Sequence, residues 1–301
     1  MIYYLVTYKH RYTTRKWIKH SAQLLDRMRI LPYQRLRGWL KPGVFIFSDI
    51  ERLNSDLRRS ALTAWTNASK AGCTCLNHPS ESLRRVDLQH ALNNDFRVFR
   101  ASEPSVDIRF PVFLRGENDH RGNLTELLYS SEELRSALIQ LPDALIVEFI
   151  DTSDRNGIFR KYSCFRIGDR ILPRHILFSR NWMVKQPDLV TEKFIAEELD
   201  YLRKNPHEAE VRRAFESAKI EYGRIDYGLS NDKLQIWEIN SNPMLETAAS
   251  AADPRRKNVH DLSAEFINAE FLSLIERPLP KTKRIWCGIR FDSLHRSRFE
   301  C

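Results

Sequence analysis

Residues 221–243 read EYGRIDYGLSNDKLQIWEINSNP and are the most informative part of the chain. Two runs rich in strand-forming residues flank the polar segment Ser230–Lys233, which indicates two antiparallel strands joined by a turn. Successive side chains of a strand point to opposite faces of the sheet. Pairing across this turn therefore brings Asp226 close to Glu238 on one face.

The same face is expected to carry two further polar residues. Arg224 lies two positions before Asp226, and Asn240 lies two positions after Glu238. Mg²⁺ prefers oxygen ligands and completes its shell with water and phosphate oxygens, so this set predicts a site for Mg²⁺ against a triphosphate. A guanidinium beside it can stabilise charge that develops during phosphoryl transfer. The alternative is an ordinary surface hairpin with exposed ion pairs.

Outward from this hairpin, strand-like apolar runs alternate with amphipathic runs, which predicts α/β and α+β layers. In the first hundred residues we expect strands at Ile2–Thr7 and Val44–Phe47, and helices over Thr14–Met28 and Ile50–Ala71. These elements predict an open α/β lobe that ends near Glu103.

The centre of the chain contains a strand at Phe110–Arg115, a glycine-bracketed polar loop at 116–122 and a strand at Leu145–Ile150. A hairpin is expected over Ile158–Ser179, with Gly168 in its turn. We divide the chain into an N-terminal α/β lobe at 1–103, two lobes with antiparallel sheets at 104–260, and a C-terminal helix with a basic tail at 261–301.

Composition restricts the class of protein. The 301 residues are 42% hydrophobic and 29% charged, which is typical of a globular chain and sufficient for two or three small lobes. No apolar window reaches the roughly 18 residues that a membrane span needs, and the apolar start of the chain is too short for a secretory signal. The sequence therefore predicts a cytoplasmic protein.

Charge and motifs restrict the function. The net charge of +9 favours anionic partners, but the basic residues are spread along the chain, so nucleic-acid binding is the weaker interpretation. Five scattered cysteines form no disulfide framework. The sequence has no Gly-x-x-x-x-Gly-Lys loop, no Gly-x-Gly-x-x-Gly after a strand and no hydrolase elbow, which leaves the competing nucleotide-binding and hydrolase classes without support.

The 221–243 stretch resembles the C-terminal signature of the ATP-grasp superfamily, and the resemblance extends from about Leu76 to Met244. The signature residues in this chain are Arg224-x-Asp226, Glu238-x-Asn240 and Asn242-Pro243. The resemblance implies an N-terminal pre-ATP-grasp α/β lobe followed by a two-lobed ATP-grasp domain. It implies that Asp226, Glu238 and Asn240 bind Mg²⁺, or Mn²⁺ in its place, and that Arg224 contacts the transferred phosphoryl group or the tetrahedral species.

The resemblance also implies the position of ATP. Glu148, Phe149 and Ile150 would lie at the adenine, in the hinge between the two lobes that hold the nucleotide. The ribose would lie near Asp151 or Asp154. Arg115 stands where the superfamily usually has a lysine at the phosphates, so the charge is kept while a planar fork replaces a point charge. Lys161 offers a second phosphate contact, with an exposed strand lysine as the alternative.

Three further pairs are weaker candidates. Arg174 and His175 lie on a strand and would bind an acidic substrate, although a strand histidine usually just packs in the core. The others are His120 and Arg121, on the loop that resembles a mobile flap over the phosphates, and Arg84 and Arg85, near the junction of the first two lobes.

The predicted function is an ADP-forming ligase. ATP and Mg²⁺ would activate a small-molecule or peptide carboxylate as an acyl phosphate, and an amine or thiol would then attack it. Two alternatives stay open: a phosphotransferase that uses the same fold, and a nucleotide-binding protein without catalytic activity.

Overall fold

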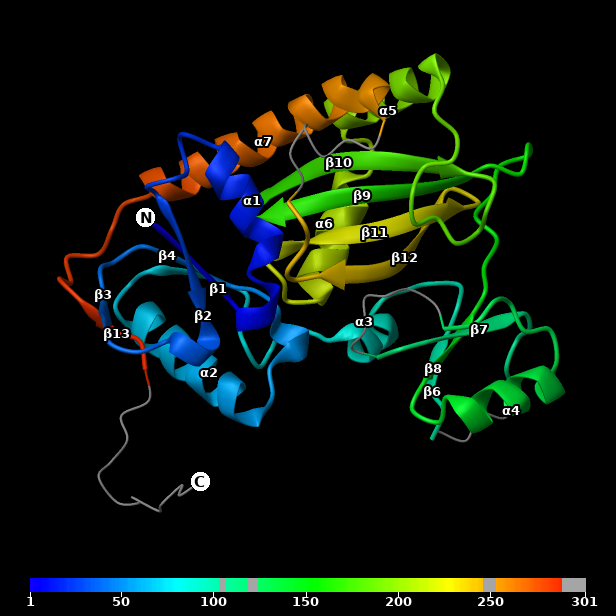
Figure 1. The fold of residues 1–301 in the computed structure, drawn as a ribbon, viewed down its shortest axis with the longest axis horizontal. Coiled ribbons are helices and arrows are strands. Elements are labelled where there is room, and N and C mark those ends of the chain that lie inside the picture. The colour runs from blue at the N-terminus through cyan, green and yellow to red at the C-terminus, as the bar shows by residue number, and fades with distance from the viewer. Residues whose placement is uncertain (103–106, 118–123, 246–252, 289–301) are drawn as a thin grey trace.

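A computed structural model describes residues 1–102, 107–117, 124–245 and 253–288 of the chain. Its three larger sheets form three lobes (Figure 1). The parallel N-terminal sheet lies on the left of that view, a small central lobe lies at the lower right, and the C-terminal sheet lies above and between them. Among the described residues, none of the helices combines the length and the apolar character that a membrane crossing requires.

The N-terminal lobe is an open parallel sheet. Every residue of its first strand is buried, as expected for a parallel strand that is covered on both faces. The strand order is β2-β1-β4-β5. Its strands and main helices are β1 (Ile2–Val6), α1 (Tyr12–His20), β2 (Met28–Pro32), β4 (Val44–Phe47), α2 (Ser55–Lys70) and β5 (Thr74–Leu76).

One expectation for this lobe was wrong. The helix expected over Thr14–Met28 ends at His20, and Met28 begins β2 instead. The run from Met28 to Pro32 pairs residue by residue with β1. Residues 22–27 form turns that lead into β2, so the helix ends early and the chain is free to pair Met28 with Ile2. Such pairing depends on a distant segment, which local sequence cannot reveal.

The central lobe is a three-stranded antiparallel sheet with the order β6-β8-β7. It contains β6 (Val98–Arg100), β7 (Val112–Arg115), α4 (Ser131–Gln140) and β8 (Leu145–Glu148), and it is preceded by α3 (Arg85–Ala91). Because β6 pairs with β8, this sheet takes a strand from before residue 103. We therefore propose that the central lobe begins before β6, while the other lobe boundaries stay predictions.

The C-terminal lobe is a four-stranded antiparallel sheet with the order β10-β9-β11-β12. Both expected hairpins are present, and Gly168 occupies the first turn with a φ of 60°. The elements are β9 (Phe159–Ile167), β10 (Arg170–Ser179), α5 (Glu192–Lys204), α6 (Glu208–Ser217), β11 (Tyr222–Ser230), β12 (Lys233–Asn240) and α7 (Lys257–Glu276).

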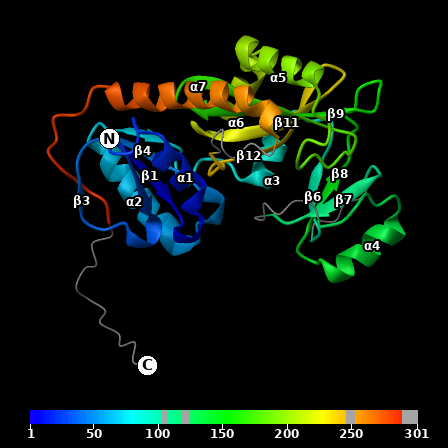
Figure 2. The same cartoon turned by 45° about the horizontal axis from the view of Figure 1, so that its top comes forward.

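The two faces of this sheet have different neighbours. One face packs against α5 and α6. The other face packs Phe165 and Tyr222 against Ile2 and Tyr4 of β1 and against Phe271 of α7. Figure 2 shows α7 extending over both the N-terminal lobe and the C-terminal sheet. One continuous core therefore fixes the first lobe against the strands that carry the predicted metal ligands.

The C-terminal segment returns to the first lobe. β13 (Ile285–Trp286) pairs with β3 (Trp39–Leu40) beside α2. Residues 289–301 of the basic tail lie outside the described residues.

Candidate active site

The predicted pairing of the two signature strands is present. Asp226 lies opposite Glu238, and Arg224 lies opposite Asn240. The register shifts between Asp226 and Tyr227, so β12 has one extra residue at Trp237. Such a bulge redirects side chains locally, and Trp237 and Glu238 both line the same cavity.

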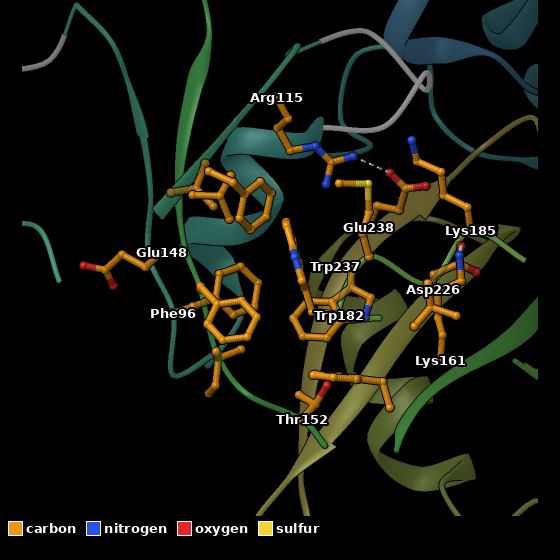
Figure 3. Close-up of a pocket in the computed structure, with 18 of the residues that line it drawn as sticks. Phe96, Arg115, Glu148, Thr152, Lys161, Trp182, Lys185, Asp226, Trp237 and Glu238 are labelled. Atoms are coloured by element: carbon orange, nitrogen blue, oxygen red, sulfur yellow. Dashed lines mark hydrogen bonds and ion pairs between the residues drawn. The ribbon is translucent and has the colours of Figure 1, made fainter. Parts of the chain in front are cut away.

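This cavity has a volume of about 420 Å³ and lies between the central and C-terminal lobes. Aromatic rings form one end of it, and charged side chains form the other (Figure 3). The rings belong to Phe96, Phe113, Phe149, Trp182 and Trp237. The charged groups at the other end belong to Arg115, Lys161, Lys185, Arg224, Asp226 and Glu238.

The aromatic end is suited to a flat apolar group. The Trp182 ring lies 5.1 Å from Phe113 and 5.6 Å from Phe149, measured between ring centroids. The ring centroids of Phe96 and Trp237 are 5.4 Å apart. Aromatic pairs at such distances stabilise one another by about 0.5–1.5 kcal/mol beyond the burial of area, so these rings support each other as the lining of an aromatic slot.

Basic groups surround both carboxylates at the charged end. Asp226 is buried and accepts hydrogen bonds from Arg224 Nε at 3.0 Å and from Ser163 Oγ at 2.6 Å, with Lys161 Nζ at 3.5 Å. Glu238 Oε2 lies 2.9 Å from Nη2 of Arg115. Three of the predicted phosphate-binding and catalytic cations therefore converge on the two carboxylates among the three predicted metal ligands.

The donor set fits a metal ion that arrives with phosphate oxygens. Within the residues that the structure describes, no group of three or more His, Cys, Asp or Glu could hold a metal by itself. Asn240 adds an amide oxygen, which already accepts a hydrogen bond of 2.8 Å from the backbone N–H of Asn242. Mg²⁺ commonly takes one or two carboxylates and completes its octahedron with water and nucleotide phosphates, which matches Asp226 and Glu238.

Glu148 is placed differently from the other hinge residues. Its carboxylate points away from the cavity (Figure 3) and accepts hydrogen bonds from Arg97 Nε at 3.0 Å and Arg109 Nη2 at 2.7 Å. Burial raises the pKa of Glu148, but these two arginines outweigh burial and lower the pKa to about 2. Glu148, Phe149 and Ile150 all line the cavity, although the Glu148 carboxylate is turned away from it. Within the hinge, the apolar side chains thus face the slot, and the Glu148 carboxylate holds the strands together behind it.

The two aspartates expected at the ribose lie beside the cavity. Asp151 is exposed and accepts a hydrogen bond of 2.8 Å from the Ser153 backbone. Asp154 pairs with Arg160 at 2.7 Å. Thr152, between the two aspartates, lines the cavity. Neither Asp151 nor Asp154 is among the described residues that line it.

The weaker candidates lie elsewhere. Arg174 and His175 are buried, and Arg174 Nη2 contacts His260 Nδ1 of α7 at 3.4 Å. Burial, together with nearby arginines, holds the pKa of His175 well below its usual value. Arg84 donates to the carbonyl of Leu53 at 3.3 Å. Nothing is described for the Arg85 side chain, and His120 and Arg121 lie in 118–123, outside the described residues.

Sequence reasoning missed several residues that line the cavity. Trp182, Met183 and Lys185 come from the loop after β10, and Phe96 precedes β6. An aromatic residue in a polar loop directly after a strand was the available signal for Trp182. No local signal indicated that this loop folds back over the hinge.

Comparison with known proteins identifies the fold. No protein-family model matches the sequence, and a comparison with curated proteins gives no match either. The structure is similar to D-alanine–D-alanine ligase from Bacillus anthracis complexed with ATP, with a TM-score of 0.50 and 11% identity over 92% of this chain and 99% of that chain. It is also similar to the ATP-grasp ligase PsnB, complexed with a phosphomimetic variant of its minimal precursor, Mg and ADP, with a TM-score of 0.51 and 11% identity over 91% and 97% of the two chains.

The chain therefore has the ATP-grasp fold that its 221–243 stretch predicts. Its mixed α/β architecture, a parallel sheet followed by antiparallel sheets, is the expected one.

Proposed function

We propose that this protein is an ATP- and Mg²⁺-dependent ligase that joins a carboxylate to an amine or a thiol through an acyl phosphate. The observation that carries the proposal is the pairing of Asp226 with Glu238 at the charged end of a cavity whose other end is an aromatic slot. A nucleotide has the same polarity, with a flat base at one end and phosphates at the other.

The aromatic slot would hold the base. Trp182, Phe149 and Trp237 are among the rings that line it, and Trp182 contacts Phe149. Stacking of a base on aromatic rings contributes on the order of 1–3 kcal/mol per base. The hinge residues Phe149 and Ile150 would contribute apolar contact there, and Thr152 offers a hydroxyl near the sugar.

The charged end would hold the phosphates. Bound ATP with Mg²⁺ would supply the phosphoryl group and part of the neutralising charge. Asp226, Glu238 and Asn240 would hold the metal, and Arg115 and Lys161 would exchange their present carboxylate partners for phosphate oxygens. Arg224 lies beside Asp226 and would stabilise charge on the transferred group. Little covalent help is needed, because phosphoryl transfer depends mainly on positioning and electrostatics.

The test is an assay with hydroxylamine as a general nucleophile. The protein, ATP and Mg²⁺ would be incubated with a panel of amino acids, dicarboxylic acids and peptides, and hydroxamates would be detected by mass spectrometry. An acid that is activated as an acyl phosphate gives a hydroxamate and ADP. That acid would then be offered with a panel of amines and thiols to find the ligation product.

Other outcomes would contradict the proposal. ADP formation with a hydroxyl compound, a phosphorylated product and no hydroxamate would indicate a phosphotransferase. Nucleotide binding without any turnover across the panel would indicate a protein that binds nucleotides without catalysis.

A further inference from the structure

A second cluster of polar residues lies at the edge of the N-terminal sheet. The chain leaves β1 towards β2 on one side and returns to β4 on the other side of β1. In open α/β sheets, ligands bind outside the carboxyl ends of the strands where the strand order reverses in this way. Thr7 and His10 follow β1, and Asp49 follows β4, so all three lie at this position.

Asp49 is the centre of the cluster. Its side chain is completely buried and accepts hydrogen bonds from the Thr7 backbone at 3.3 Å, from the Thr7 hydroxyl, from His10 Nδ1 at 3.1 Å and from Arg52 Nη1. Its backbone has a φ of 59° and a ψ of 29°, the left-handed region. Aspartate is one of the few residues other than glycine that adopt this conformation routinely, and here it turns the chain so that the carboxylate faces Thr7 and His10.

The hydrogen bonds determine which nitrogen of His10 carries the proton. His10 Nδ1 has two neighbours, the Thr7 hydroxyl oxygen and the Asp49 carboxylate. The Thr7 hydroxyl donates its own hydrogen to Asp49, so both neighbours can only accept from Nδ1, and Nδ1 therefore carries the hydrogen. The lone pair of the neutral ring is then on Nε2. The side chain of His10 is 28% exposed, so it is not sealed within the core. A carboxylate that orients a histidine in this way is a recurring arrangement for proton transfer.

The cluster is connected to the end of the predicted metal strand. Ser241, directly after Asn240, donates to Glu51 Oε2 at 2.6 Å and accepts from the backbone N–H of Ile50 at 3.1 Å. Asn242 donates to the backbone carbonyl of His10 at 3.4 Å. The loops after β1 and β4 therefore contact the residues that directly follow a predicted metal ligand.

We propose that His10, oriented by Asp49, accepts a proton from the amine that attacks the acyl phosphate. This inference rests on the proposed ligase function and assigns its nucleophile as an amine. His10 Nε2 takes one proton from the substrate ammonium group, and the freed nitrogen attacks the acyl carbon. The C–N bond forms, the C–O bond to the phosphoryl group breaks, and the departing phosphate takes the electron pair and the second proton. Asp49 is a positioning residue in this step.

The experiment separates activation of the acid from attack by the amine. Wild type, His10→Asn and Asp49→Asn would be assayed with the acid and amine that the panel identifies, and separately with the same acid and hydroxylamine. Asparagine keeps a donor close to the position of Nδ1 but cannot take up a proton. Hydroxylamine is largely unprotonated at neutral pH and does not need a base. His90→Asn, on an exposed helix position, is the control.

Both variants should lose amide formation by about 100-fold or more, the usual effect of removing a general base, while hydroxamate formation changes by less than about threefold. Added imidazole should restore part of the amide formation in His10→Ala. Equal loss of both products, or loss of neither, would overturn the role of the dyad and leave the ligase function standing. If wild type forms neither product, the ligase function fails, and the dyad proposal fails with it.

Discussion

At the scale of single residues, charge neutralisation explains the arrangement of the candidate active site. Asp226 is nearly inaccessible to solvent, and a buried carboxylate persists only when donors and cations compensate it. Arg224, Lys161 and Ser163 provide this compensation in the structure. Removing the carboxylate charge leaves Arg224 and Lys161 without this partner, so folding of such a variant has to be measured beside its metal binding.

Asp226→Asn and Glu238→Gln should each lower ATP turnover by at least about 100-fold, the order of effect seen when a group that stabilises transition-state charge is lost. Phosphate release would be measured at saturating ATP, with circular dichroism to confirm that the variants are folded. Unchanged turnover in both variants would rule out the assigned metal ligands.

At the scale of elements, the β11–β12 hairpin depends on the close approach of its two strands. A Cβ on Gly223 would lie 2.9 Å from the backbone carbonyl oxygen of Asn240. A backbone atom cannot move aside as the end of a side chain can. The small size of Gly223 therefore allows the pairing that brings Arg224 opposite Asn240.

Gly223→Ala should lower the free energy of unfolding by about 1–3 kcal/mol, the usual effect of overpacking, and should weaken Mg²⁺-dependent turnover by displacing Asn240. Urea denaturation and phosphate release would measure the two effects. Ser230→Ala, at the partly exposed end of the same strand, is the control and should change stability by less than about 0.5 kcal/mol.

The Glu148 carboxylate joins the strands of the central lobe. It lies at the end of β8 and binds Arg97 before β6 and Arg109 before β7. Sequence alone suggested a nucleotide contact for this residue, and Glu148 does line the cavity. Local sequence gave no indication that its carboxylate would face away from the cavity. Its arginine partners are distant in sequence, and the fold brings them together.

Glu148 should make stability depend on pH in the acid range. Its pKa is lowered from 4.5 to about 2, so its contribution is complete above pH 4.5 and is lost as the pH falls towards 2. Glu148→Gln should be less stable than wild type at pH 7, and the difference should shrink at pH 3. Urea denaturation at the two pH values tests this, and a difference that is the same at both would contradict it.

At the scale of the whole molecule, the cavity lies between two lobes that are joined by the hinge after β8. A ligand in this cavity contacts both lobes and therefore stabilises the folded chain by mass action. The first lobe is fixed to the C-terminal sheet by the shared core that includes Tyr4 and Phe271, so the central lobe is the part that we expect nucleotide binding to affect most.

ATP with Mg²⁺ should raise the melting temperature, by an amount equivalent to about 2.7 kcal/mol at a ligand concentration of 100 Kd. Addition of EDTA should remove most of this rise, because the two carboxylates then repel the phosphates. Trp182→Ala should weaken the rise, whereas Trp39→Ala, an exposed tryptophan outside the cavity, should preserve it. Differential scanning fluorimetry would measure the four conditions, and an identical rise in Trp182→Ala would contradict the aromatic slot.

The sequence by itself determined the signature hairpin and the fold class, because alternation along a strand and a polar turn are local properties. The bulge at Trp237, which shifts the register and puts Asp226 opposite Glu238, was visible only in the structure. Asp226 and Glu238 were predicted as neighbours and are neighbours. Tertiary structure alone decided which strand Met28–Pro32 joins and which way the Glu148 carboxylate faces. It also decided that Trp182 lines the cavity and that His10 contacts Asp49. These features depend on contacts between segments that are distant in the chain, and local spacing contains no information about such contacts.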